Sequence, residues 1–68
     1  MRFSRDELLE IIKPHVLRTV VRLQGQRGPV VTEDELTGAG LSEREVRALV
    51  QTKRLLPQDE AGVYHIQL

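Results

Sequence analysis

The stretch GLSEREVRALVQTKR, residues 40–54, decides the fold of this chain because it carries a complete start signal for a helix. Ser42 and Glu45 stand three residues apart, so the hydroxyl can accept from the amide of Glu45 while the carboxylate accepts from the amide of Ser42. Leu41 before the cap and Val46 inside it are placed to pack on each other as a hydrophobic staple. The sequence therefore predicts a helix over about residues 43–54.

This helix is predicted to have two contrasting faces. Successive residues are turned by about 100° in a helix, which brings an apolar group onto one side and a cationic group onto the other. The apolar side comprises Val46, Leu49 and Val50, and the other side comprises Arg44, Arg47, Gln51 and Arg54. A rigid helix that presents arginine and glutamine has the chemistry to read phosphates and base edges in a DNA major groove. The alternative is a solvated surface helix, because Glu43 and Glu45 lie close by.

The same start signal occurs twice more. Residues 3–8, FSRDEL, and residues 31–36, VTEDEL, each place an apolar residue before a hydroxyl cap, a glutamate three residues on, and an apolar residue after it. One such match is common by chance, but three with their flanking apolar pairs indicate three helix starts. Three helices are therefore expected.

The first of these helices is expected to run over about residues 5–24. Pro14 lies in its middle and cannot donate to the carbonyl of Glu10, so a kink or break is expected between Lys13 and Pro14. The helix has a wide apolar arc, which fits either a central helix that contacts both others or a surface that pairs with a second copy. The residues predicted for a homodimer interface are Ile11, Leu17 and Val21.

The remaining segments predict a short helix and a hairpin. Residues 25–29 form a linker with two glycines and a proline, and Val30-Val31 is long enough only to add to a small sheet. A brief helix is expected over about residues 33–37, stopped by Gly38-Ala39-Gly40. Residues 55–68 read as a β-hairpin, because positions 63–68 alternate with the period of a half-buried strand. The predicted fold class is mostly α with a small β-hairpin, in one domain over residues 1–68.

Composition excludes several classes of function. The chain has 68 residues, no cysteine, and ten basic and ten acidic side chains that cancel. The absence of cysteine excludes disulfides and thiolate chemistry, and the neutral balance argues against strong unspecific nucleic-acid binding. No apolar run approaches the length of a membrane span, so a soluble, cytoplasmic protein is expected. His15 and His65 have no partner at helical or strand spacing, so no catalytic residue, metal ligand or cofactor is predicted and an enzyme is not expected.

The order of helix, short strand, helix, turn, helix and hairpin resembles the winged helix-turn-helix superfamily over nearly the whole chain. The most specific match is Gly40-Leu41-Ser42 with Val46 and Leu49, which is similar to the turn and second helix of the helix-turn-helix unit. The resemblance implies double-stranded DNA binding by a transcription-regulator-like domain. The positions that match groove-facing residues or auxiliary phosphate contacts are Arg44, Arg47, Gln51, Arg54, Lys53 and Arg27.

Two departures from the family pattern keep a second function open. The second helix is about one residue short, and the expected hairpin turn carries Asp59 and Glu60 without a lysine or arginine. Winged-helix folds also serve as protein-interaction modules, so binding to a protein partner within a larger assembly is the alternative. The expected core is Leu8, Ile12, Val16, Val20, Leu36, Leu41, Val46, Leu49, Val50 and Leu56, closed by Tyr64 and Ile66.

Overall fold

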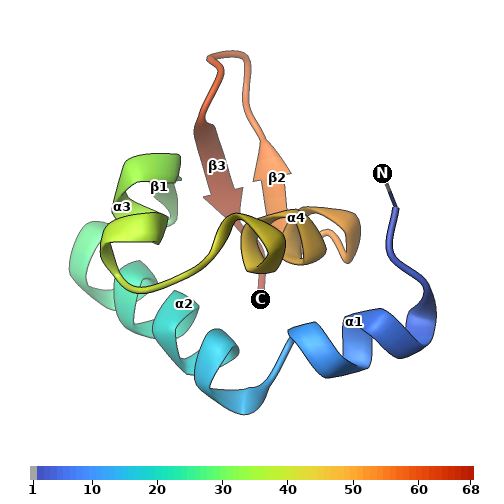
Figure 1. Cartoon of the computed structure of the whole chain (residues 1–68). Coiled ribbons are helices and arrows are strands. Elements are labelled where there is room, and N and C mark those ends of the chain that lie inside the picture. The colour runs from blue at the N-terminus through green and yellow to red at the C-terminus, as the bar shows by residue number, and fades with distance from the viewer. Residues whose placement is uncertain (1) are drawn as a thin grey trace.

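Four helices and a three-stranded antiparallel sheet make up the computed structural model, which describes residues 2–68 (Figure 1). The sheet lies beside α4, and α1 and α2 run beneath it in the view of Figure 1. The coarse prediction of helices with a small antiparallel sheet is confirmed. The elements are α1 (Arg5–Ile11), α2 (Pro14–Arg27), β1 (Val30–Thr32), α3 (Glu33–Gly38), α4 (Glu43–Gln51), β2 (Leu55–Pro57) and β3 (Val63–Ile66).

All three predicted capping boxes are present. The hydroxyls of Ser4, Thr32 and Ser42 each accept from the backbone amide three residues on, and the glutamate at that position accepts from the cap amide. The staple at the start of α4 also forms a buried pair, because Leu41 and Val46 are 5% and 3% exposed. Local hydrogen bonding therefore fixes where α1, α3 and α4 begin.

The break predicted between Lys13 and Pro14 is confirmed, so the segment predicted as one helix over residues 5–24 forms two helices, α1 and α2. Ile12 leaves helical geometry with ψ at 87°, and Lys13 is extended with φ −89° and ψ 163°. A residue before proline is pushed out of the α region, and proline itself is well suited to the first position of a new helix. The second helix then continues to Arg27, where Gly28 ends it with φ 85°.

The helix predicted over residues 43–54 ends at Gln51, three residues early. The amide of Lys53 donates to the carbonyl of Val50 (3.0 Å), and the amide of Arg54 donates to that of Leu49 (2.9 Å). These two bonds, with Lys53 at φ 62°, form a Schellman motif. Glycine usually occupies that left-handed position. Because a lysine occupies it here, the sequence did not indicate that α4 ends at Gln51.

The sheet has the strand order β1-β3-β2. The strand β3 is central, with Tyr64 opposite Val31 on one side and opposite Pro57 on the other. The amide of Glu33 donates to the carbonyl of Gly62 (2.7 Å), which ties the start of α3 to the hairpin turn. Val30-Val31 does add a strand to the predicted hairpin, and the hairpin is held beside α3.

The core matches the predicted apolar pattern in part. Leu8, Ile12, Val50, Leu56 and Tyr64 are only half-buried, although all were expected in the core. Ile12, Val50 and Tyr64 nevertheless pack against the buried core from its edge. The buried apolar residues are Ile11, Val16, Val20, Leu23, Val31, Leu36, Leu41, Val46, Ala48, Leu49, Leu55 and Ile66.

Candidate functional site: α4 and the groove beside it

The two faces of α4 are as distinct as the sequence predicted. Val46, Ala48 and Leu49 are buried against the core, while Arg44 and Arg47 are exposed on the outside. The buried face fixes the helix in place, so its outer side chains are presented from a rigid element. This outer stripe, Arg44, Arg47 and Gln51, is the part of the site that the sequence placed correctly on α4.

The N-terminal segment contacts two of the three residues of that outer stripe, Arg44 and Gln51. The side chain of Gln51 donates to the carbonyl of Phe3 and accepts from its amide, both at 2.7 Å. The guanidinium carbon of Arg44, two turns earlier, lies 5.9 Å from the centre of the Phe3 ring. Phe3 therefore contacts both ends of the stripe, and the amide of Gln51 is not free to read a base.

The remaining predicted DNA contacts are scattered. Arg47 forms a hydrogen-bonded ion pair with Glu43 one turn earlier on α4, with side chains 59% and 69% exposed. Lys53 and Arg54 lie in the Schellman motif that ends α4, so neither extends the helical stripe; Lys53 is exposed and Arg54 is half-buried. Arg27 pairs with Glu35 of α3 at 3.4 Å, beside a different hollow, and is not brought to α4.

The predicted dimer residues do not share one exposed face. Ile11 is only 7% exposed and faces inward, which corrects its assignment to an interface. Leu17 is half-buried and packs against the core, whereas Val21 is 53% exposed. Leu9, which the sequence did not single out for this role, is 69% exposed.

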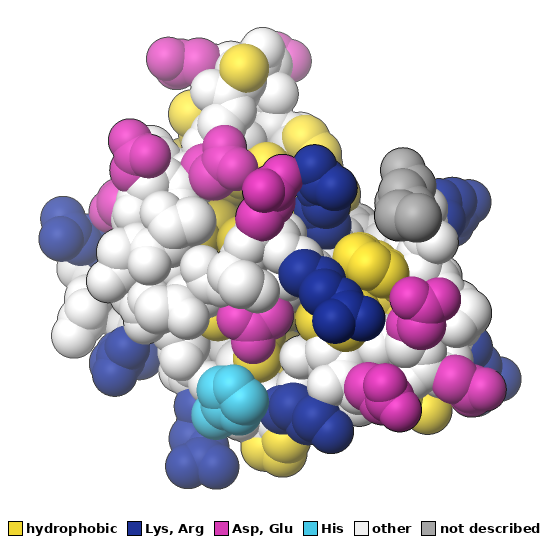
Figure 2. Space-filling model, in the orientation of Figure 1, with side chains coloured by type: hydrophobic (Ala, Val, Ile, Leu, Met, Phe, Trp, Pro, Cys, Tyr) yellow, Lys and Arg dark blue, Asp and Glu magenta, His cyan; other side chains and the backbone are white. Residues whose placement is uncertain are grey.

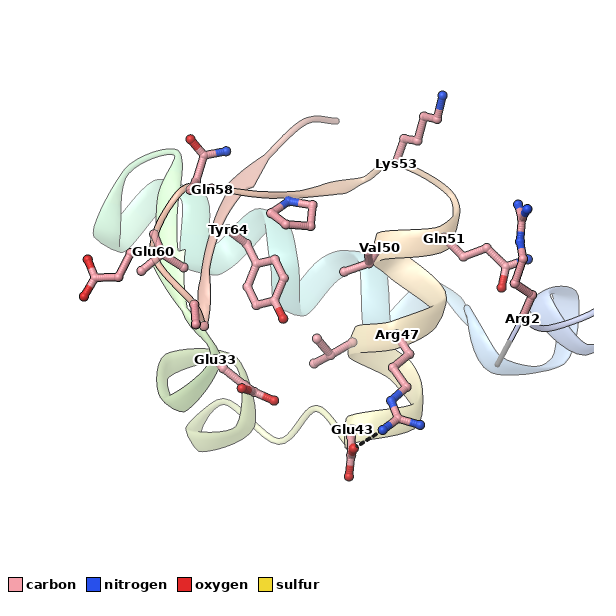
Figure 3. A pocket seen from close by; sticks show the side chains of 15 residues that line it. Arg2, Glu33, Glu43, Arg47, Val50, Gln51, Lys53, Gln58, Glu60 and Tyr64 are labelled. Carbon is pink, nitrogen blue, oxygen red and sulfur yellow. Dashed lines mark hydrogen bonds and ion pairs between the residues drawn. The ribbon is translucent and has the colours of Figure 1, made fainter.

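A groove that the sequence did not indicate runs between α4 and the β2–β3 hairpin, with a volume of about 680 Å³ (Figure 3). We call it the α4–hairpin groove. Val50 and Tyr64 point into it from opposite sides in Figure 3. Its apolar lining comprises Val46, Val50, Pro57, Ala61, Val63 and Tyr64, and its charged lining comprises Arg2, Arg47, Lys53, Glu33, Glu43 and Glu60.

The two sides of this groove differ in charge, because the charged residues on the α3–hairpin side are all acidic, whereas the α4 side carries Arg47 and Lys53 together with one acidic residue, Glu43. Figure 2 shows acidic side chains over the hairpin tip and α3, and basic side chains over α4, whose first turn also carries Glu43 and Glu45. Glu33 and Glu60 belong to the α3–hairpin side, and Arg47 and Lys53 belong to the α4 side. The hairpin pairing that joins Pro57 to Tyr64 builds one wall. The predicted hairpin was the only signal in the sequence that pointed toward this wall.

Within residues 2–68, no cluster of three or more histidine and acidic side chains is placed to hold a metal ion. Within the same residues, no helix has the length and apolar character to cross a membrane. His15 lies 3.8 Å from the carboxylate of Glu45, a contact that links the start of α2 to the cap of α4.

Comparison with protein families, with curated proteins and with solved structures gave no match to this chain.

Proposed function

We propose that this chain is a winged-helix domain that binds a protein partner through the α4–hairpin groove. The family assignment is supported by the order α2, β1, α3, α4, β2, β3 and by the strand order β1-β3-β2, which puts a hairpin next to the second helix of a helix-turn-helix unit. The helix α1 is an addition at the N-terminal side of that unit. A cytoplasmic location stays a prediction based on composition.

The observation that carries this proposal is the groove itself. Its floor is apolar, and its rim bears charges of both signs, as protein-binding sites require for an anchor and for orientation. A DNA-binding surface needs clustered lysine and arginine side chains, because most of its affinity comes from their contacts with phosphates. Glu33 and Glu60 on the hairpin side would repel a phosphate backbone. This charge distribution favours a protein partner over a duplex.

The contact of Phe3 with α4 supports the same choice. A helix with its side chains is about 10–12 Å across and the major groove is about 12 Å wide, so a segment that lies against the groove-facing side of a recognition helix obstructs its entry. On α4, one flank contacts Phe3 through Gln51 and Arg44. The opposite flank faces the hairpin across the α4–hairpin groove, where a peptide segment has room.

The test is selection of binders from a phage-displayed random peptide library, followed by binding measurements on two matched variants. Val50→Lys places a charge on the groove floor, and Val21→Lys places the same charge on the exposed outer side of α2. We expect selected peptides to lose at least tenfold in affinity on Val50→Lys and to bind Val21→Lys like the original protein. Circular dichroism verifies that both variants are folded. Selection that yields no binders, or binders indifferent to Val50→Lys, would overturn the proposal.

A second candidate is sequence-specific double-stranded DNA binding, favoured by the exposure of Arg44, Arg47 and Lys53 on or just beyond α4. Removal of one phosphate-contacting arginine lowers the salt slope of binding by about one. DNA binding therefore predicts a smaller slope for Arg44→Ala and Arg47→Ala than for an Arg18→Ala control on α2. Passage through a heparin column at modest salt, without retention, favours the protein partner. A lone domain with so few cations would need a second copy for tight operator binding.

A further inference from the structure

We infer that the segment bound in the α4–hairpin groove is an amphipathic helix whose apolar stripe is flanked by carboxylates on one side and by lysine or arginine on the other. This inference depends on the proposed function, because it names the chemistry of the partner for the same groove. The occupant is a helical protein segment whose basic flank faces the α3–hairpin side and whose acidic flank faces the α4 side.

The apolar floor has the spacing of a helix surface. Val46 and Val50 stand four residues apart, one helical turn, on α4; Val50 is half-buried and open to the groove, and Val46, 3% exposed, lies at its base. Pro57, Val63 and Tyr64 line the groove from the hairpin side. A partner helix with apolar residues at intervals of three and four can lay its own ridge between these two sets.

The charges on the two walls are left without partners across the groove. Within residues 2–68, no ion pair links Lys53 or Arg2 to Glu33 or Glu60, and Arg47 pairs only with Glu43 of its own helix. Figure 3 shows Glu33 and Glu60 on the hairpin side, with Lys53 and Arg2 on the α4 side. A helix seated between these walls gains ion pairs on both flanks only if its own flanks carry opposite signs.

The alternative of an extended segment is disfavoured at the sheet edge. The strand β2 is an edge strand of three residues and ends at Pro57, which has no amide hydrogen to donate. Addition of a strand requires a row of free backbone donors and acceptors, and this edge offers a short and interrupted row. Side-chain packing into the groove is the remaining mode of recognition.

The test uses three synthetic helical peptides with the same leucine stripe, titrated into the isotope-labelled protein and followed by NMR. One peptide has one acidic and one basic flank, the second has two acidic flanks, and the third has two basic flanks. Exposed ion pairs are individually weak, so we expect the mixed peptide to bind about threefold or more tightly than either of the others. The expected shifts centre on the amides of Val46, Val50 and Tyr64.

A charge reversal on one wall provides the matched control. Lys53→Glu makes the α4 side more acidic, and we expect it to move the preference toward the peptide with two basic flanks. Lys13→Glu makes the same change in the α1–α2 connection, outside the groove, and should leave the preference unchanged.

The results that would overturn the helical partner of mixed charge differ from those that would overturn the protein-binding function. Equal binding of all three peptides at the groove, or tighter binding of a peptide with like-charged flanks, would overturn the charge pattern and leave the proposed function standing. No shift at Val46, Val50 or Tyr64 with any peptide would overturn the helical partner, while library-selected peptides that still depend on Val50 would preserve the groove as a protein-binding site.

Discussion

The replacement Gln51→Ala tests whether the N-terminal segment is held on α4. This side chain makes two hydrogen bonds of 2.7 Å to the backbone of Phe3, in a half-buried position. A hydrogen bond of this kind contributes about 1 kcal/mol net, so the loss of both is expected to lower the free energy of unfolding by about 2 kcal/mol. A domain of this size has a total stability of roughly 3–10 kcal/mol, so the change is a substantial share of it.

The assay is urea denaturation followed by circular dichroism, with amide hydrogen exchange at Phe3 as a local readout. Gln58→Ala is the matched control, because Gln58 is exposed and its side chain makes one hydrogen bond, to the carbonyl of Leu56 at 3.0 Å. We expect Gln51→Ala to shift the midpoint clearly more than Gln58→Ala and to speed exchange at Phe3. Equal losses of stability with unchanged exchange at Phe3 would refute the reasoning, and the outer stripe of α4 would then be open to a duplex.

Three further predictions concern stability, each measured by chemical denaturation. Lys53→Gly should stabilise the protein by about 1 kcal/mol and Gly40→Ala should destabilise it by a similar amount, because both positions have positive φ, 62° and 102°. Changes of the same sign in the free energy of unfolding would contradict this. Leu36→Ala should cost about 2–5 kcal/mol because the side chain is fully buried, whereas Leu9→Ala, 69% exposed, should change stability by less than about 0.5 kcal/mol. Ser42→Ala should cost about 1 kcal/mol through loss of the cap on α4, and an unchanged midpoint would show that the cap is dispensable.

Helix starts were predictable because their cause is local. A hydroxyl cap and a glutamate three residues later satisfy each other's backbone amides, and all three pairs formed as expected. The helix ends were less predictable. Gly40 ends α3 in a Schellman motif, as a glycine there suggests, but Lys53 takes the same left-handed geometry at the end of α4 without the usual residue.

The candidate site was predictable only where it lies on a single helix. The positions of Arg44, Arg47 and Gln51 on the outer side of α4 follow from helical period. Their partners do not, because Phe3 is 48 residues from Gln51 in sequence, and its contact depends on how α1 docks. The groove likewise depends on strand register, which brings Tyr64 opposite Pro57.

Our proposal of a protein partner rather than a duplex depends on what flanks α4. The cations of this segment suit a duplex, since Arg44 and Arg47 lie on α4, and Lys53 and Arg54 follow it. In the folded chain, the side-chain amide of Gln51 is hydrogen-bonded to the backbone of Phe3, and the guanidinium of Arg47 is paired with Glu43. Across the groove from α4 lie the carboxylates of Glu33 and Glu60. Each of these interactions must be broken or opposed before phosphates can approach. None of them blocks the apolar floor of the groove, and the charges that repel a duplex are those that would orient a helix of mixed charge.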